Sequence, residues 1–379
     1  MRKIYLDYAA AAPLDPKVLK TMEPYFADEF YNPSATYLDA KKTRQAVETA
    51  RKDIAGIIGS QASEIIFTAG ATEANNLAIQ GVMRRFPKAE LLISSTEHDS
   101  VLEPAKLSRH KLVPVDGQGI VSVDSLAGLI SDQTVLVSII LINNETGALQ
   151  PIKDIFRLLE SVRKKRKAEG SVLPLYLHTD AAQAPSYLDL HSVRLQVDMM
   201  SINGGKIYGP KQTGFLFVRT SVELKPLILG GGQERGLRAG TENVAGVVGL
   251  AAALKLAVEG RVQETARVKA LNELFREGLA AHIPTAAVNG SLKHRSPHIL
   301  SITFAGYDNE RLMMELDEAG VKAAVGSACS ASSEEPSRVL AAMGLPAELI
   351  RSTLRFSFGK STTKQNIRDT VQVLSKLTS

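Results

Sequence analysis

Cysteine and tryptophan are almost missing from this sequence, whose 379 residues include one cysteine, Cys329, and no tryptophan. A single cysteine excludes a disulfide within the chain and a cysteine-based metal site, so we expect no resident metal. No segment approaches the ~18 consecutive apolar residues of a membrane span. The long apolar core of a signal peptide is also missing from the first residues, MRKIYLDYAAAAPLD. We therefore expect a cytoplasmic protein without a membrane partner, in which Cys329 serves packing or chemistry.

The chain also lacks a strong excess of charge. Its formal net charge is +5, and the one dense basic run, residues 163–167, follows the helical pattern IFRLLESV. Cations are favourable at the C-terminal end of a helix because they interact with the helix dipole. We interpret the run as a solvated helix end and expect no direct binding of nucleic acid.

Apolar residues, by contrast, are abundant. They make up 44% of the chain, more than one ordinary core accommodates at this length, which predicts two domains. Short runs rich in Ile, Val and Leu alternate with segments of helical period. These runs are EIIFTAG, ELLISSTEH, VLVSIILINNE, LYLHTDAAQ, VDMMSINGGK and TGFLFVR. Such alternation predicts an α/β fold built on a sheet.

Helical patterns and a change of texture suggest where the domains divide. Residues 244–258 are apolar nearly all round and predict a buried helix, whereas residues 42–58 place one apolar face on a helix: Ala46, Val47, Ala50, Ile54 and Ile57. After residue 260 a charged helical pattern runs to 281, followed by strands such as HILSITF and a last helix with the apolar face Ile367, Val371 and Leu374. We predict a large domain of residues 14–258 and a small domain of residues 1–13 and 259–379.

Polar residues follow several predicted strands at the end where α/β sheets place ligands. In EIIFTAGATEANNLAI a strand meets a turn and a helix, so backbone N–H groups and the Thr72 hydroxyl can hold a phosphate. In LYLHTDAAQAP a strand delivers Asp180, whose carboxylate can pair with a protonated ring nitrogen. A helix N-cap is the alternative role for Asp180.

A lysine and the cysteine lie in glycine-rich loops. Lys206 follows two glycines between two predicted strands, so its amine projects from a tight loop with little crowding. A surface lysine in a turn is the alternative. Cys329 lies in VGSACSASSEEP, among Gly, Ser and Ala, which is typical of an exposed, mobile loop at about residues 324–336. A buried structural cysteine is the alternative.

Taken together, the motifs resemble those of the cysteine desulfurases, the class V branch of fold-type I pyridoxal-phosphate enzymes, in the group with a mobile Ser-Ala-Cys-Ser loop. They span nearly the whole chain and are YLDYAAAAP, TAGATEANN, TEH, NNETG, DAAQ, GGKIYGPK, GGGQERGLRAGTEN, GSACSASSEEPS and LRFSFG. The resemblance implies a large domain with a mostly parallel seven-stranded sheet. It also implies a smaller α+β C-terminal domain that carries the cysteine loop, and a homodimer.

The resemblance further implies a role for each site residue. Lys206 would bind pyridoxal 5′-phosphate covalently, Asp180 would pair with its pyridine nitrogen, and His98 would stack on its ring and move protons. Cys329 would be the nucleophile. Gln183 and Asn144 would contact the ring oxygen, and Arg355 and Asn32 would bind the substrate. The phosphate would be held by Ala71, Thr72, the Asn203–Lys206 loop and Thr241 of the partner subunit.

Elementary chemistry agrees with these implied roles. A guanidinium such as that of Arg355 binds a carboxylate through two parallel hydrogen bonds. A free cysteine has a pKa of ~8.5, so Cys329 needs a base such as His98, or the substrate complex itself, to become the attacking thiolate. The products would be alanine and a persulfide on Cys329. In a partner complex the same thiol would also suit a transient iron–sulfur ligand.

Two positions of the lysine loop depart from the family. Asn203 and Gly205 stand where most members have serine and histidine, which removes a hydroxyl and an imidazole from the phosphate side. The Asn203 amide is still able to donate a hydrogen bond to a phosphate. Gln233 replaces a histidine of many members, and the sequence ends with the helix LSKLTS where some members have a longer C-terminal tail, so binding of the usual scaffold partner is left open.

We therefore expect a cysteine desulfurase that takes sulfur from L-cysteine and passes it to an acceptor or scaffold protein, for iron–sulfur cluster assembly or thiolation. One alternative is a selenocysteine lyase or cysteine C–S lyase, which would share the fold and the lysine. Another is a catalytically weakened sulfur-relay or docking protein. The intact set of Lys206, Asp180, His98, Cys329 and Arg355 argues against the last alternative.

Overall fold

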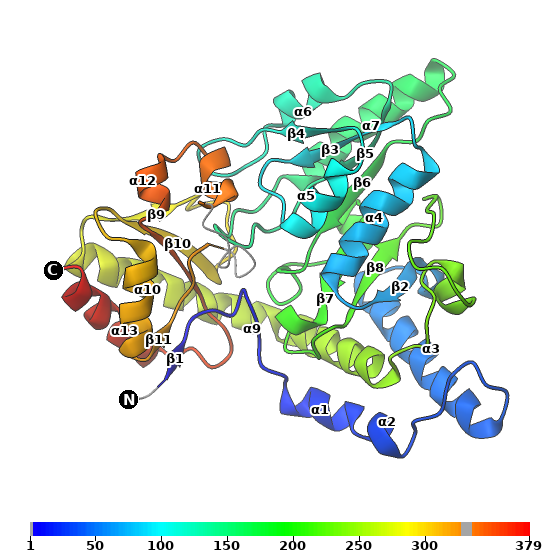
Figure 1. Cartoon of the computed structure of the whole chain (residues 1–379), viewed down its shortest axis with the longest axis horizontal. Helices are drawn as coiled ribbons and strands as arrows, with labels where there is room; N and C mark the ends of the chain where they lie inside the picture. The colour runs from blue at the N-terminus through cyan, green and yellow to red at the C-terminus, as the bar shows by residue number, and fades with distance from the viewer. Residues whose placement is uncertain (1–2, 327–335) are drawn as a thin grey trace.

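The computed structural model of the chain describes residues 3–326 and 336–379, and its largest element is a seven-stranded sheet (Figure 1). The strand order is β2-β8-β7-β6-β5-β3-β4, in which β8 is antiparallel to both neighbours and β7, β6, β5, β3 and β4 are parallel. The strands are β2 (Ile65–Thr68), β3 (Glu90–Ser94), β4 (His110–Val113), β5 (Thr134–Ser138), β6 (Tyr176–Asp180), β7 (Met199–Asn203) and β8 (Gly214–Val218). The predicted α/β fold with a mostly parallel seven-stranded sheet is confirmed.

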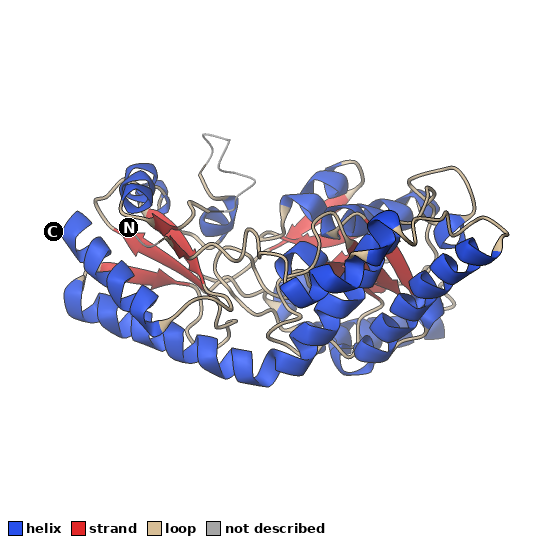
Figure 2. Ribbon diagram, turned by 90° about the horizontal axis from the view of Figure 1, so that it is seen from below, coloured by secondary structure: helices blue, strands red, loops and turns tan. Residues whose placement is uncertain are grey.

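Helices cover both faces of this sheet (Figures 1 and 2). Successive strand residues point to opposite faces, so Ile66 packs in the core with α4 (Ala71–Arg85) and α5 (Asp99–Lys106). Ile65 and Phe67 pack in the core on the other face, with α3 (Leu38–Ile58), α7 (Ile152–Ala168) and the first half of α9 (Val244–His282). Burial on both faces explains why the strands are continuous apolar runs.

The helix predictions hold in outline. On α3, Val47, Ala50 and Ile54 are buried as expected, while Ala46 and Ile57 lie at the margin of the buried face. The basic run lies at the C-terminal end of α7, but the prediction that it is solvated is wrong for Arg166, which is 5% exposed and donates to the carbonyl oxygens of Pro174 and Ser131. The buried pattern after Val244 and the charged pattern that follows it form one continuous helix of 39 residues, α9.

A second core lies beside the C-terminal half of α9. Strand β10 (Ile299–Phe304) pairs antiparallel with β12 (Thr353–Ser357) and β9 (Ala286–Asn289), and β1 (Ile4–Tyr5) pairs parallel with β11 (Val321–Lys322). Helices α10 (Asn309–Glu318) and α13 (Lys364–Leu377) cover this core, and Ile367, Val371 and Leu374 of α13 are buried in it as expected. The predicted domain boundary at residue 259 falls inside α9, so the division into two domains stays a prediction.

Short helices complete the described part of the chain. They are α1 (Pro16–Met22), α2 (Pro24–Ala27), α6 (Val123–Leu129), α8 (Ser192–Leu195), α11 (Arg338–Ala342) and α12 (Ala347–Ile350), with single 3₁₀ turns at Ala62–Glu64, Gly204–Lys206 and Gln233–Gly236. None of the helices in residues 3–326 and 336–379 is long and apolar enough to cross a membrane.

Candidate active site

The carboxyl ends of the parallel strands and the start of α4 line a pocket, as expected for an α/β sheet. The N-terminal segment and β12 also contribute to it. Its lining residues are Ala9, Ala10, Ala71, Thr72, His98, Ser100, Ile140, Ile142, Asn144, Asp180, Ala182, Gln183, Asn203, Lys206 and Arg355. All predicted site residues except Asn32, Thr241 and Cys329 are among them.

Asp180, the last residue of β6, is 5% exposed, and each of its carboxylate oxygens accepts one hydrogen bond. Its Oδ2 accepts a 2.7 Å hydrogen bond from Asn75 Nδ2, and its Oδ1 accepts one of 2.9 Å from the backbone N–H of Ala182. No helix starts after Asp180 until α8 at Ser192, so the N-cap alternative does not apply. The carboxylate is placed to pair with a cationic ring nitrogen.

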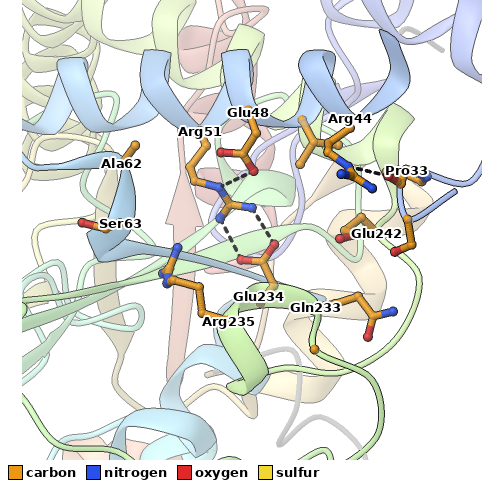
Figure 3. A pocket seen from close by; sticks show the side chains of 13 residues that line it. Pro33, Arg44, Glu48, Arg51, Ala62, Ser63, Gln233, Glu234, Arg235 and Glu242 are labelled. Atoms are coloured by element: carbon orange, nitrogen blue, oxygen red, sulfur yellow. Dashed lines mark hydrogen bonds and ion pairs between the residues drawn. The ribbon is translucent and has the colours of Figure 1, made fainter. Parts of the chain in front are cut away.

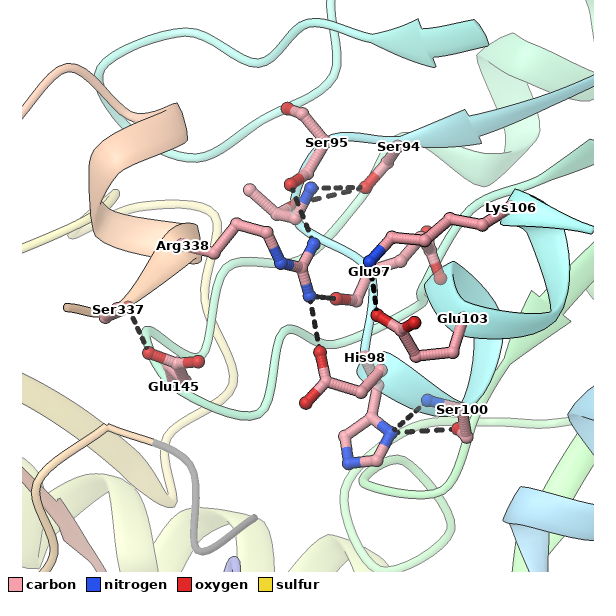
Figure 4. A network of polar contacts seen from close by, with 12 residues as sticks. Ser94, Ser95, Glu97, His98, Ser100, Glu103, Lys106, Glu145, Ser337 and Arg338 are labelled. Atoms are coloured by element: carbon pink, nitrogen blue, oxygen red, sulfur yellow. Dashed lines mark hydrogen bonds and ion pairs between the residues drawn. The ribbon is translucent and has the colours of Figure 1, made fainter. Parts of the chain in front are cut away.

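His98 is the N-cap residue of α5, and its ring orientation follows from that position. Its Nδ1 accepts a 3.0 Å hydrogen bond from the backbone N–H of Ser100 and lies 2.8 Å from Ser100 Oγ (Figure 4). A ring nitrogen that accepts carries no proton, so the proton of neutral His98 is on Nε2. Asn75 Nδ2 donates to Ser100 Oγ at 2.8 Å, so one amide supports both His98 and Asp180.

Lys206 lies in the pocket and not on the surface, which removes the alternative of a turn lysine. Its Nζ donates hydrogen bonds to the carbonyl oxygens of Ala9 at 2.8 Å and Ala10 at 2.5 Å. The turn that carries it is tight, because a Cβ on Gly204 would lie 2.4 Å from Thr213 Oγ1. The glycine thus allows β8 to approach and fixes where the lysine leaves the sheet.

The start of α4 has the features of an anion site. Its N-cap, Gly70, has φ 122° and provides no side-chain cap, which leaves the N–H groups of the first turn for a ligand. Asn203 faces this turn: its Oδ1 accepts from the backbone N–H of Gly205, and a Cβ on Gly70 would lie 3.9 Å from its Nδ2. The amide nitrogen of Asn203 is therefore directed toward the helix start.

Arg355 supplies a buried positive charge from β12. It is 2% exposed, its Nη1 donates to Asn144 O at 3.0 Å, and its Nη2 donates to Asp7 Oδ1 at 2.7 Å. Its Nε is buried and has no hydrogen-bond partner among the described residues. A guanidinium with an unused donor in a pocket wall suits a carboxylate ligand.

Three predicted residues are not in this pocket. Asn32 is exposed, its Oδ1 accepts from the backbone N–H of Ser34, and Ser34 lines a different cavity of about 600 Å³ (Figure 3). Thr241 is also exposed, and its neighbour Glu242 lines that same cavity. The prediction for Cys329 lies outside the described residues.

The cavity of Figure 3 is bounded by the glycine-rich segment of residues 230–243, which Glu234 holds in place. The Glu234 carboxylate accepts from both terminal nitrogens of Arg51 at 2.8 and 2.7 Å and from the backbone N–H of Phe67 at 2.9 Å. Both side chains are almost fully buried. Breaking a buried, hydrogen-bonded ion pair such as Arg51–Glu234 is strongly destabilising, so this pair fixes the position of the segment relative to α3.

A polar network connects α11 with two loops of the pocket (Figure 4). Arg338 Nη2 donates to Glu97 O at 2.9 Å and to Asp99 Oδ1 at 2.8 Å, and Ser337 Oγ donates to Glu145 Oε2 at 2.6 Å. Asp99 and Glu145 are the immediate neighbours of His98 and Asn144. The start of α11 is thereby attached next to two pocket residues.

Two carboxyl groups in this network are buried. Glu97 is 0% exposed, its Oε1 accepts from the backbone N–H of Ile140 at 2.6 Å, and burial raises its pKa to about 8. Burial also raises the pKa of Glu145. Glu97 is therefore largely a neutral carboxylic acid at pH 7.

Several residues of the pocket were missed by the sequence analysis. Asn75 and Ser100 had a detectable signal, because Asn75 follows Ala71 by one helical turn and Ser100 stands two residues after a helix-starting His98. Asp7, which binds Arg355, and the carbonyl of Ala9 gave no signal. Their roles depend on how distant segments meet.

The comparisons with known proteins agree with this geometry. Residues 4–369 match the aminotransferase class-V family. The chain belongs to this family. It is 38% identical over 383 residues to the cysteine desulfurase IscS of Dictyoglomus turgidum, covering 99% of this chain and 94% of the relative. It is 40% identical over 376 residues to the putative cysteine desulfurase IscS 1 of Bacillus subtilis, covering 97% and 96%.

Solved structures give the same result for this class-V chain. A NifS-like protein superposes with a TM-score of 0.90 at 31% identity, covering 99% of both chains. SspA in complex with cysteine superposes with a TM-score of 0.80 at 34% identity, covering 94% of this chain and 98% of that one. The predicted family and fold are confirmed.

The class-V family implies pyridoxal phosphate, and the residues present fit that group. An amine able to condense with its aldehyde, a carboxylate for its ring nitrogen and an uncapped helix start for its phosphate lie in one pocket. In residues 3–326 and 336–379, no group of three or more His, Cys, Asp or Glu is arranged to hold a metal ion. The amine, the carboxylate and the uncapped helix start match an organic phosphate cofactor.

Proposed function

We propose that this chain is a pyridoxal-phosphate-dependent cysteine desulfurase that transfers sulfur from L-cysteine to Cys329. The observation that carries the proposal is the convergence of Lys206, Asp180, His98 and Arg355 on one pocket at the carboxyl edge of the sheet. The matching family and its curated cysteine desulfurase relatives support it. The cofactor, when bound, supplies an electron sink that stabilises negative charge on the substrate carbons.

The residues of the chain divide the remaining work. Asp180 would pair with the protonated ring nitrogen through its buried carboxylate, which Asn75 and the backbone N–H of Ala182 hold in place. Lys206 would hold the cofactor through its amine, and the same amine would move protons on the substrate carbons. His98 lies on the pocket wall with its proton on Nε2, and exchanges protons there.

Substrate binding uses the buried guanidinium. Arg355 binds the carboxylate of L-cysteine through two of its nitrogens. One is the unused Nε, and the other is Nη2, which donates to Asp7 Oδ1 in the structure. Asn144 keeps the guanidinium oriented through its carbonyl oxygen. SspA, a structural relative of this chain, has been solved in complex with cysteine, which supports the choice of substrate.

The transfer step balances without an external oxidant. The Cys329 thiolate attacks the substrate sulfur, an S–S bond forms, and the bond between the sulfur and the Cβ of the substrate breaks. The electron pair of that bond remains on the substrate carbon, which takes up a proton to become alanine. Cys329 retains the sulfur as a persulfide, which is passed to an acceptor or scaffold protein. A cytoplasmic location is part of the proposal.

A homodimer completes the proposed site. Thr241 does not line the pocket of its own chain, and Glu234 attaches its segment to Arg51 of α3. Four large apolar side chains close to Asn32 in the sequence are exposed: Phe26, Phe30, Tyr37 and Leu38. Such a patch is expected to be covered by a partner. We propose that Thr241 of the partner subunit donates to the cofactor phosphate.

Subunit mixing tests this arrangement. Dimers of Lys206→Ala alone and of Thr241→Ala alone are expected to be inactive or strongly weakened. In a mixed dimer, the Thr241→Ala subunit keeps its lysine and receives an intact Thr241 from the other subunit, so activity should return. Mixed dimers that stay as weak as the Thr241→Ala parent would contradict the contact across the dimer.

Product analysis tests the proposed reaction. Purified protein supplied with pyridoxal phosphate, L-cysteine and a thiol reductant should release alanine and sulfide in equal amounts. Pyruvate in place of alanine would identify a C–S lyase instead. Absence of any turnover with cysteine, together with full turnover of selenocysteine, would identify a selenocysteine lyase.

A further inference from the structure

Gln183 lies where three parts of the chain meet, and a short series of hydrogen bonds passes through its amide. Its Nε2 donates to Ala9 O at 2.9 Å, and its Oε1 lies 3.2 Å from His298 Nε2. His298 Nδ1 lies 2.6 Å from Ser296 Oγ. Gln183, His298 and Ser296 are all buried, with exposed fractions of 9%, 3% and 2%. Each donor in the series therefore needs a defined acceptor.

The direction of this series is fixed by its carbonyl end. Because Ala9 O can only accept, the Gln183 atom that faces it must be the amide nitrogen. Gln183 Oε1 then faces His298, so His298 Nε2 must carry the ring proton and donate it. His298 Nδ1 is left as an acceptor for the hydroxyl of Ser296. A single tautomer of His298 satisfies all three contacts.

The surroundings of His298 keep its ring neutral and in place. Burial, together with the smaller effect of the positive charges of Arg355 and Arg295, lowers its pKa to about 3. The ring of Tyr187 stacks on it with centroids 4.0 Å apart and planes at 9°. A neutral, stacked imidazole donates one hydrogen bond in one direction over the whole physiological pH range.

We propose that His298 is a positioning residue that locks the amide of Gln183 with its N–H₂ group toward the cofactor pocket. Among the described residues, Gln183 Nε2 has one acceptor, Ala9 O, so its second hydrogen remains for the ring oxygen of the cofactor. Without His298 the amide loses the donor to its Oε1, and the contact of Nε2 with Ala9 O alone holds the N–H₂ group toward the ring oxygen. The inference rests on the proposed function, since it concerns the same cofactor.

Two substitutions separate the hydrogen bond from the packing of the ring. His298→Phe keeps a flat ring against Tyr187 and removes both nitrogens, whereas His298→Gln keeps an amide N–H donor and removes the ring. We expect the apoprotein of His298→Phe to bind pyridoxal phosphate about tenfold more weakly, the effect of one hydrogen bond, and His298→Gln to bind nearly as well as the parent. In a Gln183→Leu background, His298→Phe should have no further effect.

The tautomer of His298 is a second test that needs no folded variant at that position. Nitrogen-15 NMR of the unsubstituted apoprotein should show His298 protonated at Nε2 and not at Nδ1. The Nδ1–H tautomer, equal affinities of the two variants, or an undiminished affinity of His298→Phe would overturn the inference. Failure of the parent protein to bind pyridoxal phosphate at all would instead overturn the proposed function.

Discussion

Asn75 donates hydrogen bonds from one amide nitrogen to two groups of the pocket, Asp180 Oδ2 at 2.7 Å and Ser100 Oγ at 2.8 Å. The side chain is fully buried, and its Oδ1 has no hydrogen-bond partner among the described residues. An amide that leaves its own oxygen unsatisfied in order to direct both hydrogens outward has a cost of desolvation. In return, Asn75 holds the Asp180 carboxylate and, through Ser100, the His98 ring in fixed positions relative to each other.

Asn75→Asp should weaken cofactor binding. The change replaces the donor to Asp180 by a second carboxylate at the same distance, so one of the two acids must take up a proton. We expect the affinity of the apoprotein for pyridoxal phosphate to fall by about tenfold or more, measured by absorbance titration. Asn76→Asp, which adds the same charge one residue later, is the matched control, and equal losses in both variants would contradict the role of Asn75.

Asn203 should act on the phosphate end of the cofactor and nowhere else. Asn203→Ala removes the amide directed toward the start of α4, and we expect about a fivefold to tenfold loss of affinity for pyridoxal phosphate. Asn203→Ser, which restores the residue usual in the family, should recover part of the loss. Pyridoxal without its phosphate should bind all three proteins equally well. A loss of pyridoxal affinity in Asn203→Ala would place its contact elsewhere.

Glu97 should make the folded state less stable as the pH rises. Burial raises its pKa from 4.5 to about 8, so between these values the folded protein keeps a proton that the unfolded chain has lost. The free energy of unfolding should therefore fall with rising pH by about 1.4 kcal/mol per unit from this group alone. Glu97→Gln should remove that slope, measured by urea unfolding at several pH values.

The exposed Glu103 provides the control for this measurement. Glu103→Gln should leave the pH dependence of stability unchanged, because the Glu103 carboxylate lies on the surface of α5 in an exposed pair with Lys106. The difference between Glu97→Gln and the parent cancels the contributions of other buried groups such as His178. An unchanged slope in Glu97→Gln would show that Glu97 is ionised in the folded state.

Arg355→Lys should separate charge from hydrogen-bond geometry. Lysine keeps the positive charge and loses the planar fork that matches a carboxylate. We expect KM for L-cysteine to rise roughly tenfold to a hundredfold, the range for a charge-assisted hydrogen bond, while cofactor binding stays normal. Cysteamine, which lacks the carboxylate, should react equally with both proteins. A KM for L-cysteine that does not change would remove Arg355 from substrate binding.

Sequence patterns were sufficient for most of the fold because buried parallel strands are continuous apolar runs. Six of the seven sheet strands lie in the six runs singled out, and the ends of those runs delivered Asp180 and the Lys206 turn. Strand β4, at the edge of the sheet, was missed because only its last residue, Val113, is buried. The single helix α9 was divided in two by its change from apolar to charged composition.

The finer contacts of the pocket could not be predicted from local patterns. Asp7 meets Arg355 across 348 positions of the chain, and Ala9 meets Gln183 across 174. Such pairs are set by how β1 and β12 pack beside the sheet and leave no periodicity in either segment. The family resemblance supplied the roles of Lys206 and Asp180, and it gave no reason to single out Asn75 or His298.

The transfer of sulfur to Cys329 is the central claim, and the single cysteine of the chain makes it directly measurable. The holoenzyme is mixed with L-cysteine in the absence of a reductant, and the intact protein and its peptides are analysed by mass spectrometry. The account predicts that the peptide containing Cys329 gains one sulfur atom while alanine is released. The Cys329→Ala variant should still bind pyridoxal phosphate but should neither gain sulfur nor release alanine. Alanine released by Cys329→Ala at the rate of the parent, with no added sulfur on the parent protein, would contradict it.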